Sequence, residues 1–300
     1  MINIVSCTHM DDDIINELKA LNRSLRRLAD LYLPQVDFQV FDQFDAFKAV
    51  KLNGHASLKG IAEPDPVSFC ELRGIGSVEI SLRENTEQFL GNLPCNNVLL
   101  HGPRGTGKSS AIKAIFNAYR DQGLRMIEMP RDTLFHLFEI ADMIRGRSEH
   151  FIVFCDDLSF EEEESSYRQL KAILEGGLET RPKNMLIYAT SNRRHLMPER
   201  QRDNLPVYSD GELHPAETLE ERLSLSDRFG LRLGMLHFDA ETYLDIVHNY
   251  AKLRKIDIEP EELAKKAMQW SLSHGSYSGR TARQFIDNLE GFRALKQRKR

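Results

Sequence analysis

One eight-residue segment constrains the fold of this chain more than any other feature. Residues 102–109 read Gly-Pro-Arg-Gly-Thr-Gly-Lys-Ser and directly follow the apolar run Val98-Leu99-Leu100. This spacing is that of a phosphate-binding loop, in which a strand leads into a glycine-rich turn and then into a helix. The glycines let the backbone curl until successive N–H groups face inward, where they can bind phosphate oxygens. The pattern therefore predicts an α/β fold and a nucleoside triphosphate ligand.

The positions of this loop have separate expected parts in binding. We expect Lys108 to reach the β- and γ-phosphates and the Ser109 hydroxyl to ligate Mg²⁺. A helix that begins near Lys108 would place its positive N-terminal end beneath the phosphates. The alternative is a glycine-rich turn between two core elements, which the strand pattern before it and the helix pattern after it disfavour. The residues expected to bind the nucleoside triphosphate are Gly102, Pro103, Arg104, Gly105, Thr106, Gly107, Lys108, Ser109 and Ser110.

The composition narrows the class of protein. The 300 residues are 41% hydrophobic and 28% charged with a net charge of −5, which is not the basic excess that indicates general polyanion binding. No apolar stretch approaches the ~20 residues needed to span a bilayer. The N-terminus lacks the basic and apolar segments of a secretory signal. Cys7, Cys70, Cys95 and Cys155 have neither metal-ligand spacing nor a disulfide-like arrangement. We therefore expect a cytoplasmic protein that does not enter a membrane.

The chain before the loop has helical patterns. Apolar residues alternate spacings of four and three from Ile14 to Leu28, and phenylalanines recur at spacing three from Phe38 to Phe47. The first pattern predicts an amphipathic helix packed on its own domain. A coiled coil or partner-docking surface is the alternative, which so few heptads do not favour. We expect residues 1–70 to form a mainly helical N-terminal region.

The rest of the chain divides into two patterns. Strand and helix patterns alternate over residues 71–238, which predicts an α/β nucleotide-binding domain with a five-stranded parallel sheet flanked by helices. Residues 239–300 read as three helices, and we expect them to form a small helical lid domain. The basic cluster at 296–300 predicts a solvated tail. The five expected strands are residues 97–101, 124–129, 151–155, 185–190 and 231–238.

Two aspartates directly follow the third expected strand. Cys155, the last residue of that strand, is expected to be a small core residue. We expect Asp156 to hold Mg²⁺ opposite Ser109, directly or through water. Asp157 would stand beside the γ-phosphate and orient and deprotonate the attacking water. The pair could instead only cap the following turn, but the phosphate-binding loop upstream favours the functional interpretation.

Three further polar residues complete the candidate site. Asn192 follows the fourth expected strand, where its amide could hydrogen-bond the attacking water or the γ-phosphate. Arg228 stands just before the last expected strand, and Arg280 stands at the start of the last helix. Guanidinium groups suit the spreading charge of phosphoryl transfer, although either arginine could be a surface charge.

The ordered set GPRGTGKSS, FCDDLSFEE, YATSNRRHL, LSLSDRFGL and SGRTARQF resembles the motifs of the AAA+ ATPases. The resemblance implies that residues 72–75 lie against adenine, with Ile75 as the main contact. It implies that Asn192 is sensor 1 and that Arg280 is sensor 2, reaching down from the lid. It also implies a homo-oligomer in which Arg228 is an arginine finger, acting on ATP held by the neighbouring subunit.

The resemblance covers residues 72–300 and is closest to a bacterial ATP-binding family catalogued as domain of unknown function 815. That family implies ATPase chemistry but no cellular task. The chain departs from most AAA+ proteins in having Asp157 where they have glutamate, which implies slow hydrolysis or help from a neighbour. An Asp-Asp pair is similar to the initiator and helicase-loader branch. The aromatic-apolar-glycine loop of protein unfoldases is missing after Met129, which disfavours threading of proteins.

The sequence thus predicts a cytoplasmic AAA+ ATPase that hydrolyses MgATP and remodels an unidentified protein partner. The alternative is an ATP-gated loader or adaptor with slow hydrolysis. A nucleic-acid-associated form of this alternative draws on Arg193, Arg194, Arg200 and Arg202, which could equally contact other subunits, so nucleic acid is not the favoured partner. A small-molecule kinase is disfavoured, because no acceptor site is evident and the two candidate catalytic arginines would be unexplained.

Overall fold

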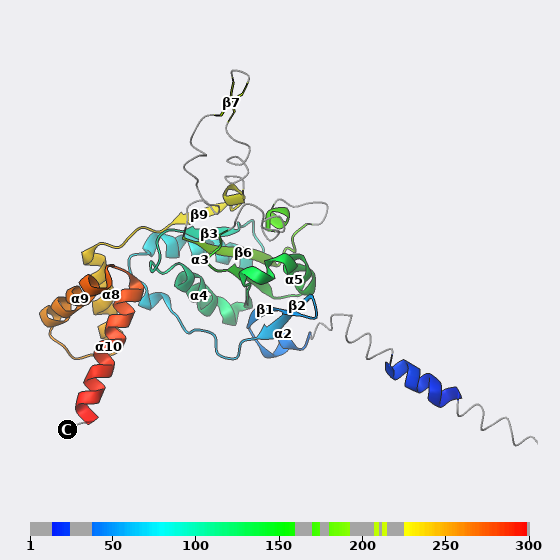
Figure 1. Cartoon of the computed structure of the whole chain (residues 1–300), viewed down its shortest axis with the longest axis horizontal. Coiled ribbons are helices and arrows are strands. Elements are labelled where there is room, and N and C mark those ends of the chain that lie inside the picture. The colour runs from blue at the N-terminus through cyan, green and yellow to red at the C-terminus, as the bar shows by residue number, and fades with distance from the viewer. Residues whose placement is uncertain are drawn as a thin grey trace, which may run out of the picture.

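A seven-stranded sheet, with strand order β2-β1-β4-β5-β6-β3-β9, lies at the centre of the computed structural model (Figure 1). Helices cover both of its faces, and three further helices follow it in the chain. The statements below concern the residues that the structure describes. These are residues 14–24, 38–159, 170–174, 180–192, 207–209, 212–214 and 225–298.

The expectation of a parallel α/β sheet is confirmed. Six strands run parallel, and every residue of β6 and all but the first of β5 are buried, as is typical of central strands covered on both faces. β9 ends at Gly234, so the expected extension of this strand to Phe238 is wrong. The strands that correspond to the five expected ones are β3 (Val98–His101), β4 (Leu124–Glu128), β5 (His150–Cys155), β6 (Met185–Ser191) and β9 (Leu231–Gly234).

The expected number of five strands is too small, because a hairpin extends the sheet. β1 (Ala46–Leu52) pairs in parallel with β4 and antiparallel with β2 (His55–Gly60). Asn53 and Gly54, which join the two strands, have φ angles of 51° and 90°. Two central residues with positive φ make the tight turn that suits the twist of a hairpin, and Asn-Gly is the dipeptide that favours it. The mainly helical expectation for residues 1–70 is therefore wrong for residues 46–60.

The phenylalanines spaced by three do not share one helix. Only α2 (Val40–Gln43) is helical in this stretch, whereas Phe47 lies on β1, where the exposed Lys48 separates the buried Phe47 and Ala49. Phe41 and Phe47 pack together in the core with ring centroids 5.1 Å apart. Upstream, residues 14–24 are helical with their large apolar side chains exposed, and Leu25 and Leu28 of the expected seam lie outside the described residues.

Alternate residues of the central strands pack into two separate cores. Phe151, Val153 and Cys155 of β5 face one core, and Ile152 and Phe154 face the other. This is the period of two that a strand imposes on its side chains. The second core includes α3 (Gly76–Leu90) and α4 (Lys108–Tyr119), and the first includes α5 (Leu137–Ile144).

The three C-terminal helices expected from the sequence are confirmed. α8 (Ala240–Leu253), α9 (Pro260–His274) and α10 (Gly279–Arg298) enclose a third apolar cluster of their own. Asp239 caps α8 by accepting a hydrogen bond of 2.8 Å from the backbone N of Thr242. In Figure 1 these helices gather at one end of the sheet, and the β1–β2 hairpin lies at the other.

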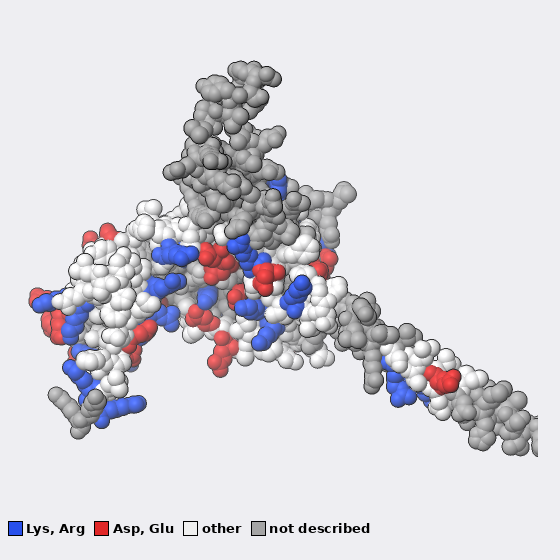
Figure 2. All heavy atoms as spheres, viewed as in Figure 1, with Lys and Arg blue, Asp and Glu red and all other residues white. Residues whose placement is uncertain are grey.

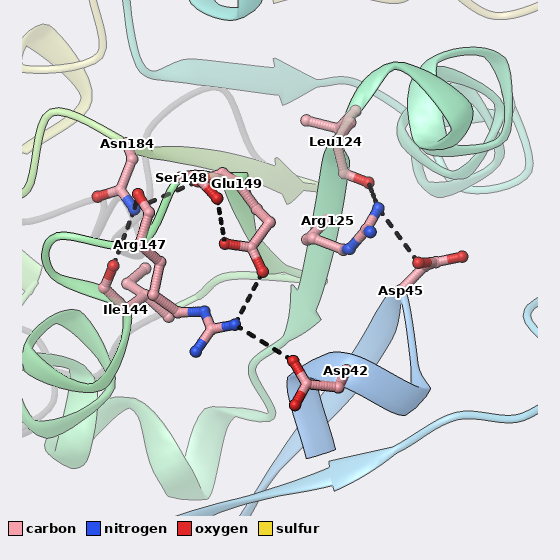
Figure 3. Close-up of polar contacts among 9 residues, drawn as sticks. All are labelled: Asp42, Asp45, Leu124, Arg125, Ile144, Arg147, Ser148, Glu149 and Asn184. Carbon is pink, nitrogen blue, oxygen red and sulfur yellow. Dashed lines mark hydrogen bonds and ion pairs between the residues drawn. The ribbon is translucent and has the colours of Figure 1, made fainter. Parts of the chain in front are cut away.

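Polar contacts join the chain before β1 to the amino ends of the neighbouring strands. Figure 3 shows Arg147 pointing toward Asp42, and Arg125 toward Asp45. The Arg125 Nη1 lies 3.1 Å from Asp45 Oδ1, and the Arg147 guanidinium stacks 4.3 Å from the centroid of the Phe41 ring. The Arg147–Asp42 distance of 4.0 Å at an exposed site makes that pair weak. This network anchors α2 at the edge of the sheet opposite the phosphate-binding loop.

Burial of β5 predicts an inert thiol. Two causes raise the pKa of Cys155 from 9.0 to about 12: desolvation by burial, which is the larger, and the negative charge of Asp156. We expect Cys155 to resist a thiol-specific disulfide reagent in the native protein and to react after denaturation, whereas the exposed Cys70 reacts at once. The Cys155→Ala variant identifies the late signal. Rapid native reaction of Cys155 would contradict this packing.

The same pKa shift predicts a direction for stability at alkaline pH. The folded state holds this proton more tightly than the unfolded state does. The contribution of Cys155 to the free energy of unfolding is therefore fully present below pH 9 and is lost as the pH rises toward about 12. Urea unfolding across this interval should show a smaller decline in the Cys155→Ala variant than in the wild type.

Candidate functional site

The loop after β3 has a backbone that glycine adopts more readily than other residues. Gly102, Gly105 and Gly107 have φ angles of 141°, 79° and 95°. A Cβ atom on Gly102 would lie 2.1 Å from the carbonyl oxygen of Met235, which directly follows β9. Glycine is thus required at position 102 both by its φ angle and by the close approach of a second chain segment. The loop lies where the carboxyl ends of β3 and β9 meet.

α4 begins at Lys108, as the sequence predicts. The first N–H groups of a helix have no partners within it, so the start of α4 can bind an anion. The Lys108 Nζ donates hydrogen bonds to the carbonyl oxygens of Gly102 (2.8 Å) and Pro103 (2.6 Å) and to Asn192 Oδ1 (3.1 Å). Desolvation lowers the pKa of Lys108, and the charges of Asp157 and Asp156 oppose that shift. A phosphate would meet a cation that the protein holds in place.

The strand order brings the expected polar residues together. β6 lies between β3 and β5, so Asn192 at its end stands between the loop and the two aspartates. The Asn192 Nδ2 donates to Asp157 Oδ1 at 2.5 Å, while its Oδ1 accepts from Lys108. The Ser109 Oγ donates to Asp156 Oδ1 at 2.6 Å. The structure therefore places Ser109 and Asp156 opposite each other.

This pair of oxygens fits Mg²⁺. That ion takes one or two protein oxygens and completes its shell with water and substrate phosphates. Among the described residues, no group of three or more His, Cys, Asp or Glu side chains could hold a metal by itself. A hydroxyl and a carboxylate facing a phosphate-binding loop make the donor set that a magnesium–nucleotide complex requires.

The loop, the aspartates and α10 enclose a cavity of about 640 Å³. This volume is in the range of small-molecule sites. More basic than acidic side chains line the cavity, so it suits a triphosphate that carries one divalent cation. The basic residues are Arg104, Lys108, Lys113, Arg280 and Arg283, and the acidic ones are Asp65, Asp156 and Asp157.

Most of the expected site residues line this cavity, but some described ones do not. Ile75, expected to contact adenine, is 4% exposed and packs in the core against the sheet, while Leu72 of the same segment faces the cavity. Thr106 is buried and its Oγ1 donates to the carbonyl of Pro103 at 3.0 Å, so it stabilises the turn. Arg228 precedes β9 and is not among the described lining residues. The arginine cluster at 193–202 lies outside the described residues.

Several lining residues were not singled out from the sequence. Arg283 lies one turn beyond Arg280 on α10, and this spacing of three, which puts residues on one face of a helix, could have identified it. Lys113 is four residues after Ser109 on α4 and pairs with Asp65 at 3.0 Å. No local pattern points to Tyr250 of α8, because only the fold brings that helix to the cavity.

The C-terminal helices contact the phosphate-binding loop directly. The backbone N of Gly279 donates to the carbonyl oxygen of Gly105 at 2.9 Å. A Cβ atom on Gly105 would lie 2.8 Å from the Cβ of Ser278. At a second contact, Asn249 of α8 accepts from Arg73 Nη2 at 2.6 Å and donates to the carbonyl of Cys70 at 2.8 Å. The loop and the start of α10 therefore form one continuous wall of the cavity.

This wall predicts different costs for two similar substitutions. Gly107→Ala meets no atom within 4 Å, so its cost is the left-handed conformation alone, about 1–2 kcal/mol. Gly105→Ala has the same kind of φ angle and also displaces Ser278, so it should lower the free energy of unfolding further. Urea unfolding without nucleotide compares the two variants. Equal losses would mean that α10 does not press on the loop.

The fold and the site define an α/β protein of the P-loop type. The chain belongs to the family described as "Protein of unknown function (DUF815)", whose profile matches residues 42–293. The resemblance to domain of unknown function 815 is thereby confirmed. A search of curated proteins finds no significant match.

Solved structures of similar shape include RuvB of Thermotoga maritima, described as a Holliday junction branch migration motor. It is 15% identical with a TM-score of 0.44, over 75% of this chain and 72% of that one. One RuvB variant has 15% identity and a TM-score of 0.46 over the same shares, and another has 16% and 0.44 over 75% and 73%. Among the described residues, no helix combines the length and apolarity needed to cross a membrane.

Proposed function

We propose that this chain is an AAA+ ATPase that binds MgATP in the cavity and hydrolyses it. The observation that carries the proposal is the hydrogen-bonded set formed by Lys108, Ser109, Asp156, Asp157 and Asn192. These side chains come from the ends of the adjacent strands β5 and β6 and from the start of α4. Their types and arrangement match the requirements of phosphoryl transfer to water, which depends mainly on positioning and charge stabilisation.

In this proposal the loop backbone and Lys108 bind the β- and γ-phosphates. Ser109 and Asp156 hold Mg²⁺, which when bound neutralises charge on the phosphate oxygens. Arg104 and Ser110 also face the cavity and belong to the binding loop. The segment 72–75 forms the wall of the cavity beside the adenine ring. Leu72 lines the cavity, and Ile75 supports that wall from the core.

Asp157 is the proposed base for the attacking water, and Asn192 positions that water. Support comes from the 2.5 Å contact between Asn192 Nδ2 and Asp157 Oδ1, which fixes both side chains toward the loop. Asp157 is shorter by one methylene than the glutamate of most AAA+ proteins. A slow basal rate is consistent with that difference.

The two arginines have complementary proposed positions. Arg280 lines the cavity of its own chain and would stabilise transferred charge in cis. Arg228 precedes β9 and is not among the described residues that line the cavity. An arginine finger that acts in trans occupies such a position, and we propose a homo-oligomer on this basis. The neighbouring Phe229, 1% exposed, anchors the turn that carries Arg228.

The remaining parts of the proposal concern partners and organisation. We propose an unidentified protein partner in the cytoplasm, residues 71–238 as the nucleotide-binding domain, 239–300 as the lid and 1–70 as a separate N-terminal region. Nucleic acid is not favoured, because acidic and basic side chains are interspersed over the face in Figure 2 and the net charge is −5.

A substitution of Lys108 tests nucleotide binding directly. Lys108→Ala should weaken ATP binding about 10- to 100-fold, because a hydrogen bond to a charged group contributes about 1.5–3 kcal/mol. Lys51→Ala on the distant β1 is the matched control and should bind as the wild type does. Titration calorimetry with MgATP measures both. Unchanged affinity in Lys108→Ala would place the nucleotide elsewhere.

A mixing experiment tests the shared site. Arg228→Ala and Asp157→Asn should each be nearly inactive in ATP hydrolysis, since an arginine finger contributes about 10³–10⁵ in rate. A mixture of the two variants should recover activity above either parent, because some interfaces then combine an intact Arg228 with an intact Asp157. Mass measurement with ATP verifies that mixed oligomers form. Mixed oligomers without recovery at any ratio would argue against hydrolysis in trans.

A second function is favoured specifically by Asp157. In this alternative the protein is an ATP-gated loader or adaptor, in which occupancy of the cavity changes the affinity for a partner and turnover is incidental. Fast ATP turnover by the purified protein without any partner would exclude it. Slow turnover together with an ATP-dependent change in partner capture by Asp157→Asn would support it.

A further inference from the structure

The end of β6 contains a buried hydroxyl that contacts both aspartates. Thr190 is 1% exposed. Its Oγ1 donates a hydrogen bond to Asp156 Oδ1 at 2.5 Å and accepts one from the backbone N of Asp157 at 2.8 Å. One side chain thus holds the carboxylate of one aspartate and the backbone of the next.

The backbone between the two aspartates makes this contact consequential. Asp157 has a φ angle of 52°, in the left-handed region that residues other than glycine seldom adopt. The resulting bend separates the two side chains, so that Asp156 meets Ser109 and Asp157 meets Asn192. The hydrogen bond from the Asp157 N–H to Thr190 holds the residue at the centre of that bend.

Neighbouring contacts restrain the turn without touching the carboxylates. The backbone N of Leu158 donates to the carbonyl of Thr190 at 2.7 Å, and the Ser191 Oγ donates to the carbonyl of Leu158 at 2.8 Å. Ser191 therefore offers a matched comparison. It is a buried hydroxyl on the adjacent residue, and its hydrogen bond is to the carbonyl of the same turn.

The Thr190 hydroxyl both donates and accepts a hydrogen bond at this site. A hydroxyl has one proton to donate, and here it goes to Asp156. The same carboxylate oxygen also accepts from Ser109, whose oxygen is the proposed ligand of Mg²⁺. We propose no contact between Thr190 and the metal. The hydrogen bond from Thr190 to Asp156 can therefore persist whether Ser109 contacts Asp156 or Mg²⁺.

We propose that Thr190 is a positioning residue that directs Asp156 toward Mg²⁺ and Asp157 toward the attacking water. This inference rests on the proposed MgATP site. Thr190 acts through the two aspartates and touches no reacting atom. Outer-shell partners of metal ligands typically change metal affinity or activity by about 10- to 100-fold when they are removed.

The test compares Thr190→Val, which keeps the branched shape but lacks the hydroxyl, with Thr190→Ser, which restores it. Ser191→Ala is the matched control. The main measurement is binding of a fluorescent ATP analogue as a function of Mg²⁺ concentration. Paramagnetic resonance of Mn²⁺ bound with ATP gives a second readout independent of turnover. ATPase kinetics then separate kcat from KM.

We expect Thr190→Val to raise the Mg²⁺ concentration for half-maximal analogue binding by about 10- to 100-fold. Metal-free binding of the analogue should stay at the wild-type level, and kcat should fall more than KM rises. Thr190→Ser should restore the wild-type Mg²⁺ dependence. Ser191→Ala should leave it unchanged. In an Asp156→Ala background, Thr190→Val should have no further effect on Mg²⁺ dependence, because its influence passes through that carboxylate.

Wild-type Mg²⁺ dependence in Thr190→Val would overturn the inference, and so would an equal loss in Ser191→Ala. Circular dichroism and urea unfolding verify that the variants fold, and Thr190→Ala replaces Thr190→Val if the latter does not. Failure of the wild-type protein to bind the analogue with Mg²⁺ would instead overturn the proposed function. The two failures are therefore distinguishable.

Discussion

A buried ammonium group needs polar partners to keep its charge, and Lys108 has them because parallel strands end beside one another. β6 lies between the strand that leads into the loop and the strand that leads into the aspartates. Asn192 at its end can therefore accept from Lys108 with one amide atom and donate to Asp157 with the other. The rest of the site is arranged around this link. A different strand order would leave the lysine and the carboxylates without a common neighbour.

The cavity also depends on the approach of helices from outside the sheet. The hydrogen bond from Gly279 to Gly105 and the contacts of Asn249 hold α10 and α8 against the loop and the segment before α3. Two arginines of α10 then face the space above Lys108. Basic groups from two separate parts of the chain thus surround one site, which is the electrostatic environment that a triphosphate with one metal ion requires.

Local patterns predicted a large part of this arrangement. The parallel strands, the start of α4 at Lys108 and the three last helices follow from short-range periodicity and from glycine spacing, which act within a few residues. Phenylalanines spaced by three predict a helix, whereas residues 46–60 form a hairpin. The dipeptide Asn53-Gly54 carried the contrary signal. On β1 the buried Phe47 and Ala49 stand two residues apart, which is the spacing of a strand face rather than the spacing of three.

By itself the sequence determined that a phosphate-binding loop stands between a strand and a helix and that two aspartates follow another strand, because loop chemistry and strand patterning are local properties. Only the tertiary structure decided that Leu72 rather than Ile75 faces the cavity, that Tyr250 of α8 reaches it, and that Thr190 contacts both aspartates. Those outcomes depend on which face of an element turns inward and on which strands become neighbours. Such choices arise from packing between segments far apart in the chain, and short-range patterns do not encode them.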